Sequence, residues 1–550
     1  MGILTAMRTG SLKLKFFLAV SFGLVTPLIA GPLSASLPLV PKWGRFEQSF
    51  RSSTSYSNPL QEATLNLLFI SPSGITNRVD GFWDGENTWR ARFSPDEVGR
   101  WTFRTICSDP ANRGLHNHSG EFICTATTAT SRFSQHGPIR LARDRRHFEH
   151  ADGTPFFWVA DTVWDGPRNS ELKDWQFYTR TRAIQQFTVA QWAVGSGKGA
   201  RSKSPWIGSP ERVAINPDFF QRLDVKLEML ARAGILSAIV PQPNWEMGDS
   251  PPTTLPEAQA ALLLRYFRAR WGADPVVWLL GQQTDEQTRD LSLWKNLGAD
   301  LFGALPRVPV VWLARNVSRG FDDFRAASWI DAFGFAPVTD FEDKALSSGL
   351  TGPFASEWKK EPARPLIVIA PCENGRSQST RRFTSDDVRH AIYWDLLMAP
   401  PAGITYSAQG LIQWDNARKA EISEDLPMWQ KCLFLPAAKQ MAHLVKFINS
   451  TEFWRLRPRP DFVVAQPGNT SPGHYIAAAG TEAKDLSLVY VPEDRTVEIL
   501  LDALPSAPNV SWLNPRTGES SPAVAVVGTS TCQFPTPDAG DWLLVMKAGR

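Results

Sequence analysis

The chain has 550 residues, too many for one hydrophobic core, and its length suggests about three domains. Hydrophobic residues make up 43% and charged residues 21%, which excludes a disordered, collagen-like or multi-span membrane protein. The net charge of +3 gives no reason to expect a nucleic-acid partner. The 22 tryptophans against 7 tyrosines are typical of β-sandwich cores and also of clefts that stack against sugars.

Residues 1–35 have the pattern of a secretory signal peptide. Basic residues Arg8, Lys13 and Lys15 precede an apolar run over 16–30 that is short for a membrane span. Small residues follow without a clean cleavage motif, so an uncleaved N-terminal anchor stays open as the alternative. We therefore expect a secreted or periplasmic protein with no membrane span in its mature chain.

From residue 36 to about 130, short runs with period-two alternation are separated by turns. The clearest cover residues 64–70, 89–93 and 99–106. Strands spaced about ten residues apart in this way predict an antiparallel β-sandwich. Cys107 and Cys124 flank a turn-rich segment, and they either pair across two strands or remain two buried thiols.

Between residues 137 and 457, apolar strand-like runs alternate with segments of helical periodicity. Eight strands are expected, at residues 156–160, 188–192, 235–240, 276–280, 308–313, 332–335, 366–370 and 403–406. Helices are expected at residues 172–186, 217–233, 256–271, 385–398 and 429–448. This size and alternation predict a (β/α)₈ barrel. The rival fold, a doubly wound sheet, would need a Gly-rich phosphate loop after a strand, and none is present.

Residues 458–550 return to short strands, notably at 487–491, 496–501 and 542–546. We interpret them as a second, C-terminal β-sandwich. The predicted fold class is therefore α/β, a TIM barrel between N-terminal and C-terminal β-sandwich domains.

Active sites of such barrels lie where the strands end, so polar residues after the strands are the candidates. The candidate catalytic carboxylates are Asp161, Asp285, Glu286 and Glu373. The candidate sugar contacts are Gln191, Trp192, Asn244, Trp245, Gln283 and Trp414. Paired carboxylates with amides and indole rings suit glycoside hydrolysis, which needs one proton donor and one nucleophile or base. Simpler roles stay open, with Asp161 as a helix cap and Asp285 or Glu286 at the start of the next helix.

Other chemistries have little support in the sequence. No H-E-x-x-H motif, CxxC pair or G-x-S-x-G elbow is present. We expect no metal and no cofactor, and we expect a polysaccharide or oligosaccharide substrate.

Several stretches together carry a resemblance to known families. Seven segments resemble the DUF4038, apiosidase-like glycoside hydrolase family, and they are Pro155–Trp164, Asn216–Asp224, Ala233–Pro241, Tyr266–Gly281, Asp387–Trp394, Gly403–Tyr406 and Gln413–Trp414. Asp80–Gly85 and Pro95–Trp101 resemble the DUF5060 sandwich. Trp512–Gly518 and Asp541–Val545 resemble the domain called putative collagen-binding domain of a collagenase, a name that does not establish collagen binding.

The resemblance implies a glycosidase that acts on polysaccharide side chains. It also implies acids at the ends of strands four and seven, where this chain has Gln283 and Ala370 instead. Either Asp285 or Glu286 acts together with Glu373 from neighbouring positions, or the barrel binds sugar and is catalytically impaired.

Overall fold

The computed structural model describes residues 36–195, 204–241, 244–245, 253–281, 288–303, 308–314, 321–335, 353–369, 372–375, 382–417 and 428–549. For residues 244–245, 253–254 and 288–293 it describes the backbone alone. Residues 38–550 form one compact unit.

Two sheets form the predicted N-terminal sandwich. One has the order β1-β8-β7-β3-β4 and the other β2-β6-β5. Their strands are β1 (Leu39–Pro41), β2 (Phe46–Arg51), β3 (Leu65–Ile70), β4 (Thr76–Asp80), β5 (Phe82–Trp83), β6 (Thr88–Phe93), β7 (Gly99–Cys107) and β8 (Ser119–Thr125). Aromatic rings from facing sheets stack in its core, Phe69 on Phe93 at 4.3 Å and Phe46 on Phe122 at 4.2 Å between ring centroids.

The two N-terminal cysteines are buried free thiols, so the disulfide alternative is wrong. Cys124 of β8 lies opposite Gly99 at the start of β7, whereas Cys107 ends β7 and lies opposite Leu65. The eight residue steps from Gly99 to Cys107 span about 26 Å of extended chain, far beyond the reach of a disulfide.

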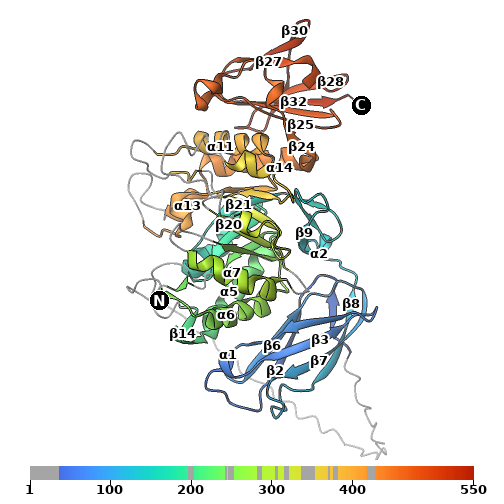
Figure 1. The fold of residues 1–550 in the computed structure, drawn as a ribbon, viewed down its shortest axis with the longest axis vertical. Helices are drawn as coiled ribbons and strands as arrows, with labels where there is room; N and C mark the ends of the chain where they lie inside the picture. Colours follow the sequence, from blue (N-terminus) through green and yellow to red (C-terminus); the bar gives the residue numbers. More distant parts are fainter. Residues whose placement is uncertain are drawn as a thin grey trace, which may run out of the picture. The chain divides into compact units, whose positions relative to one another are not determined.

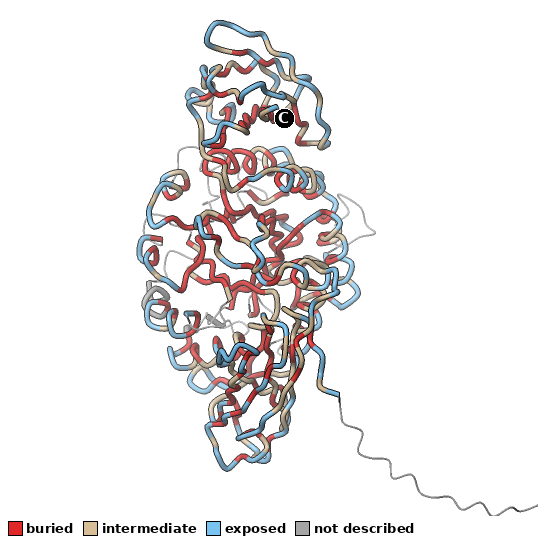
Figure 2. Tube along the Cα trace, turned by 90° about the vertical axis from the view of Figure 1, so that its right-hand side faces the viewer, coloured by how far each residue is buried: buried red, intermediate tan, exposed pale blue. Residues whose placement is uncertain are grey.

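Eight parallel strands close into a barrel, as the sequence predicts (Figure 1). They are β12 (Trp158–Thr162), β13 (Val189–Ala193), β16 (Leu236–Val240), β19 (Val276–Gly281), β20 (Val310–Ala314), β21 (Ala332–Phe335), β22 (Leu366–Val368) and β23 (Gly403–Tyr406). Their residues are almost all buried (Figure 2) because both faces of each strand are covered. Alternate side chains form two cores, a barrel interior that includes Ala160 and Val189 and an outer layer that includes Val159 and Ala190.

Helices cover the outside of the barrel (Figure 1). They are α3 (Gly166–Asn169), α4 (Leu172–Ile184), α5 (Pro217–Arg232), α6 (Glu257–Trp271), α7 (Thr288–Phe302), α10 (Pro353–Trp358), α11 (Ser385–Met398), α12 (Gln409–Ile412), α13 (Met428–Cys432) and α14 (Pro436–Asn449). Helix α5 shows the sequence logic, since Pro217 starts it and Phe219, Leu223 and Leu227 bury one face.

The single helix predicted at residues 429–448 is wrong. The chain forms α13 and then α14, with Pro436 at the first position of α14. A proline in that place starts a helix readily but would break one that ran through it.

Short elements complete the chain before the C-terminal domain. They are α1 (Pro59–Glu62), α2 (Arg132–His136), β9 (Ile139–Leu141), β10 (Phe148–His150), β11 (Pro155–Phe156), β14 (Trp206–Ser209), β15 (Arg212–Ile215), β17 (Asn244–Trp245) and β18 (Thr253–Thr254). The hairpin β14–β15 lies beside the N-terminal sandwich, where the side chains of Asn58 and Gln61 donate to the carbonyl of Val213.

The C-terminal region is a second pair of antiparallel sheets, with orders β24-β25-β26-β32-β28-β29 and β27-β31-β30. The strands are β24 (Leu456–Pro458), β25 (Ala477–Thr481), β26 (Leu486–Val491), β27 (Thr496–Leu500), β28 (Pro508–Leu513), β29 (Ser520–Pro522), β30 (Val526–Val527), β31 (Thr531–Pro535) and β32 (Trp542–Ala548). Side chains from both sheets share one core, which includes Trp512, Phe534 and Trp542.

Candidate functional site

A polar layer interrupts the apolar interior of the barrel near the C-terminal ends of β12, β13 and β23. Its members are Thr162, Gln191, Thr405 and Ser407, all at most 2% exposed. The register pairs Thr162 with Gln191, and the Gln191 amide donates to Thr405 Oγ1 at 3.0 Å. The hydroxyls of Thr162 and Ser407 and the Gln191 carbonyl oxygen have no hydrogen-bond partner among the described residues. These groups form a polar floor beneath the mouth of the barrel.

Glu373 lies beyond the end of β22, next to this floor. Its neighbour Asn374 pairs with the chain after β23, because the Asn374 N–H donates to the Ser407 carbonyl at 2.8 Å. The Asn374 amide points the other way and donates to Ser385 Oγ at 3.1 Å. Since successive side chains of an extended chain alternate in direction, Glu373 lies on the side of Ser407. It is partly exposed.

The prediction that Asp161 is catalytic does not fit its place in the structure. Asp161 follows inward-facing Ala160, so its side chain faces the helix layer and is fully buried there. Its carboxylate accepts from Arg182 Nε of α4 at 2.6 Å. Burial raises the pKa of the Asp161 carboxyl, and the Arg182 guanidinium opposes this by favouring the charged form. The ion pair anchors α4 to β12. Asp161 therefore has a structural role here in place of the predicted catalytic one.

Two predicted sugar-stacking tryptophans are likewise packing residues. Trp192 faces outward from β13 and meets Trp271 of α6 edge to face, at 5.7 Å between ring centroids. Trp414 stacks on Trp429 at 4.3 Å and tilts against Trp175 at 5.7 Å. It is only 2% exposed, so neither ring offers a face to a sugar.

The other candidates are described in part or not at all. Gln283, Asp285 and Glu286 lie outside the described residues, and Asn244 and Trp245 are described only as the backbone of β17, which pairs with β18. The role of Gln191 as a sugar contact stays a prediction, because its side chain lies within the floor. In the described part of the chain, no cluster of three His, Cys, Asp or Glu side chains could hold a metal.

The sequence reasoning missed Thr162, Thr405 and Ser407. A signal was present, because polar residues at alternate positions in apolar barrel strands mark the inward face near the strand ends. To identify these residues from the sequence, one must know which face of each strand points inward.

Active sites of closed parallel barrels lie at the C-terminal ends of the strands, where the polar floor and Glu373 are found. The profile of the "Apiosidase-like, catalytic domain" matches residues 142–455, more than half of the chain. The chain therefore belongs to the apiosidase-like family. A DUF5060 domain matches residues 39–108, and a "Putative collagen-binding domain of a collagenase" matches residues 458–547. The predicted boundaries at 36–130, 137–457 and 458–550 stay predictions.

Solved structures share the fold at low sequence identity. A putative glycoside hydrolase from Bacteroides vulgatus has 17% identity and a TM-score of 0.69, covering 93% of this chain and 99% of its own. A structure described as a glycoside hydrolase has 16% identity and a TM-score of 0.64, covering 77% and 99%. A family 5 glycoside hydrolase from B. vulgatus has 15% identity and a TM-score of 0.62, covering 77% and 95%. A search of curated protein sequences found no match.

Proposed function

We propose that the protein is a glycoside hydrolase that cleaves glycosidic bonds in polysaccharide side chains. The observation that carries the proposal is the place of Glu373, partly exposed beside the polar floor of an apiosidase-like barrel. Hydrolysis of a glycoside needs a carboxyl group at the reacting bond and a second one facing it. Glu373 supplies the first of these.

The second carboxylate in this proposal is Asp285 or Glu286, which follow β19 in the sequence. Strands β19 and β22 stand three places apart around the ring of eight, so their C-terminal ends lie on different sides of the mouth. A separation of about 5–5.5 Å between the carboxyl groups would give retention of configuration, and about 6.5–9.5 Å would give inversion. Amide groups, among them Gln283, would hold sugar hydroxyls.

We also propose that residues 1–35 direct the chain out of the cytoplasm as a signal peptide, which suits an enzyme whose substrate is a polymer. No helix in the described part of the chain is long and apolar enough to cross a bilayer.

A second candidate function follows from the sequence at the two strand ends. Gln283 and Ala370 stand where the family resemblance implies acids, and neither side chain can deliver a proton. A barrel without a competent pair of carboxylates would bind a glycan and hydrolyse it poorly.

The test is hydrolysis of a panel of plant and bacterial polysaccharides, measured as released reducing sugar. We expect release by the native protein and a drop of about 10²–10⁴-fold in Glu373→Gln, because an amide cannot transfer the proton or attack the sugar. Glu482→Gln is the matched control, since Glu482 lies in the C-terminal sandwich with an 82% exposed side chain. It should leave release unchanged.

Unchanged activity in Glu373→Gln would remove Glu373 from the mechanism. No release from any polymer, combined with saturable binding of one glycan in the panel, would establish the impaired barrel instead. The melting temperature of each variant separates loss of catalysis from loss of folding.

A further inference from the structure

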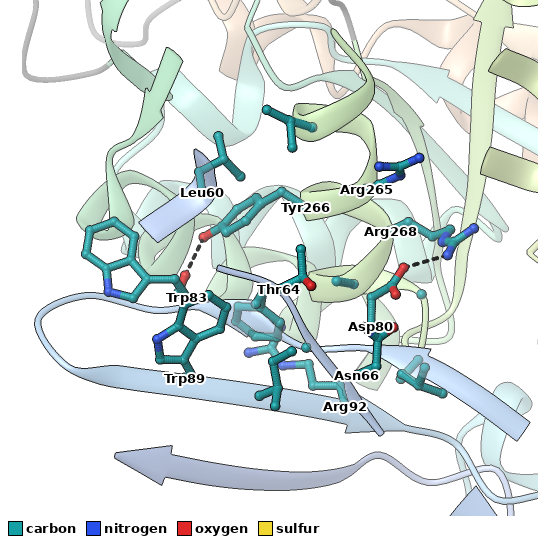
Figure 3. Close-up of a pocket in the computed structure, with 18 of the residues that line it drawn as sticks. Leu60, Thr64, Asn66, Asp80, Trp83, Trp89, Arg92, Arg265, Tyr266 and Arg268 are labelled. Carbon is teal, nitrogen blue, oxygen red and sulfur yellow. Dashed lines mark hydrogen bonds and ion pairs between the residues drawn. The ribbon is translucent and has the colours of Figure 1, made fainter. Parts of the chain in front are cut away.

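A cavity of about 560 Å³ lies between the N-terminal sandwich and helix α6 of the barrel (Figure 3). Its walls come from α1, from strands β3 to β6 and from α6. The volume falls within the range of about 300–1,000 Å³ that is typical of small-molecule sites, which often form at domain interfaces. The cavity is remote from the barrel mouth, because its lining includes no residue of the polar floor.

One end of the cavity is aromatic and fixed in place. Figure 3 shows Trp83, Trp89 and Tyr266 together at this end. The Trp83 indole N–H donates to the Glu86 carbonyl at 2.8 Å, and the Tyr266 hydroxyl donates to the Trp83 carbonyl at 3.2 Å. Trp83 remains partly exposed. Its ring is therefore a rigid apolar surface with little conformational entropy left to lose on binding.

The other end of the cavity carries more positive charge than its carboxylate can neutralise. Figure 3 shows Arg268 beside Asp80, and these two side chains form an ion pair at 2.6 Å. Arg78 uses its Nε to donate to Asn66 at 3.0 Å, and its terminal nitrogens have no partner among the described residues. Arg265 is exposed on α6 and likewise lacks a partner within the described chain.

Two uncompensated guanidinium groups at one end of the cavity and an aromatic wall at the other define the chemistry of a ligand. A guanidinium group presents paired N–H donors that match a carboxylate in two hydrogen bonds. A pyranose ring offers an apolar C–H face of about the size of an indole. An oligosaccharide that contains a sugar acid carries both features along one chain.

We propose that this cavity binds an acidic oligosaccharide, with a uronate carboxylate on Arg78 and Arg265 and a sugar ring against Trp83. The choice of a saccharide over another anion rests on the proposed function. Strand β4, which carries Arg78, is the edge strand of its sheet, so a longer chain can continue past the cavity. The site would hold the polymer while the barrel mouth acts on it.

The test is titration calorimetry of the full protein with tetra-galacturonate and with its methyl ester, which keeps the rings and removes the charge. We expect binding of the acid, and binding of the ester weaker by at least about tenfold. The double variant Arg78→Gln/Arg265→Gln should weaken binding of the acid by a similar factor, and Trp83→Ala should weaken binding of both probes. Arg180→Gln, on the exposed face of α4, is the matched control and should change nothing.

Equal binding of acid and ester, or affinity unchanged by the arginine substitutions, would overturn the proposal. Binding of adenosine monophosphate at this site without binding of tetra-galacturonate would also overturn the proposal. The same holds if neither tetra-galacturonate nor its methyl ester binds. Because the terminal groups of Arg78 and Arg265 support no other side chain among the described residues, the double variant should melt at the native temperature, which keeps the test free of folding defects.

Hydrolysis is measured separately, as released reducing sugar. Acid binding that depends on Arg78 and Arg265 in a protein that hydrolyses nothing would uphold the cavity and defeat the proposed function. Hydrolysis without such binding would uphold the proposed function and defeat the cavity proposal.

Discussion

The two β-sandwiches are attached to the barrel in different ways. Leu488, Tyr490 and Leu543 of the C-terminal sandwich belong to the same hydrophobic core as the outer helix layer of the barrel. One buried ion pair completes this joint, with Arg389 Nε of α11 donating to Asp541 at 2.7 Å.

Phe82 of the N-terminal sandwich belongs to the same core, but this joint contains more buried charge. Arg270 of α6 is fully buried and donates to Asp84 of the sandwich at 2.8 Å and to Asp224 of α5 at 2.7 Å. Arg92 of β6 reaches the same Asp224 at 2.7 Å. Burial alone would raise the pKa of Asp224, but the charges of Arg270 and Arg92 hold it below its usual value.

The difference shows what each kind of joint permits. Apolar surfaces gain free energy by excluding water over a continuous area, and packing of this kind stabilises the C-terminal joint. Ion pairs act at points and fix geometry, which leaves room for the cavity beside Tyr266. A ligand site is therefore expected at the N-terminal joint.

The largest effect should follow from Arg270→Met. This change removes two buried ion pairs, although Asp84 keeps Arg90 and Asp224 keeps Arg92 as partners. We expect unfolding to become easier by about 4 kcal/mol. Denaturant unfolding measures it. Arg232→Met on α5, where the side chain is 79% exposed, is the control and should shift the value by less than about 0.5 kcal/mol. If Arg270→Met lowers the free energy of unfolding as little as Arg232→Met does, charge does not hold this joint.

A smaller loss should follow from Arg389→Met. Only one buried carboxylate, Asp541, loses Arg389, since the other carboxylate partner of Arg389, Asp386, is exposed. Asp541 keeps a hydrogen bond from the Tyr490 hydroxyl at 2.8 Å. We expect about 3 kcal/mol in the same unfolding experiment. Lys446→Met, exposed on α14, is the control. A loss larger than that of Arg270→Met would reverse the comparison of the two joints.

Much of this fold is predictable from the sequence, because fully buried parallel strands appear as continuous apolar runs. The direction of single side chains at the strand ends is not predictable in the same way. Asp161 and Thr162 are neighbours, yet barrel closure turns Thr162 inward and Asp161 toward the helices. The partner of Asp161, Arg182, lies 21 residues further along the chain, and no local pattern identifies it.

The same argument applies to the candidate site. Trp192 and Gln191 look equally suitable as sugar contacts in the sequence, but they face opposite sides of β13. The cavity beside α6 was beyond sequence reasoning, since its aromatic and basic residues come from two domains that only packing brings together.

The smallest predicted effect concerns Asp395, which lies on α11 at the C-terminal joint. Burial raises the pKa of its carboxyl to about 8, whereas the unfolded chain ionises it near the usual value of about 4. The folded state therefore binds a proton that the unfolded state has lost, and its contribution to stability is full below about pH 4 and declines as pH rises to 8. Asp395→Asn cannot ionise, so it should be more stable than the native protein by at least about 1.4 kcal/mol at pH 8, the equivalent of one pKa unit. The gain should vanish near pH 4. Asp300→Asn, exposed on α7, should show no such pH dependence. A gain that is constant with pH would mean that Asn packs better and that ionisation of Asp395 has no part in it.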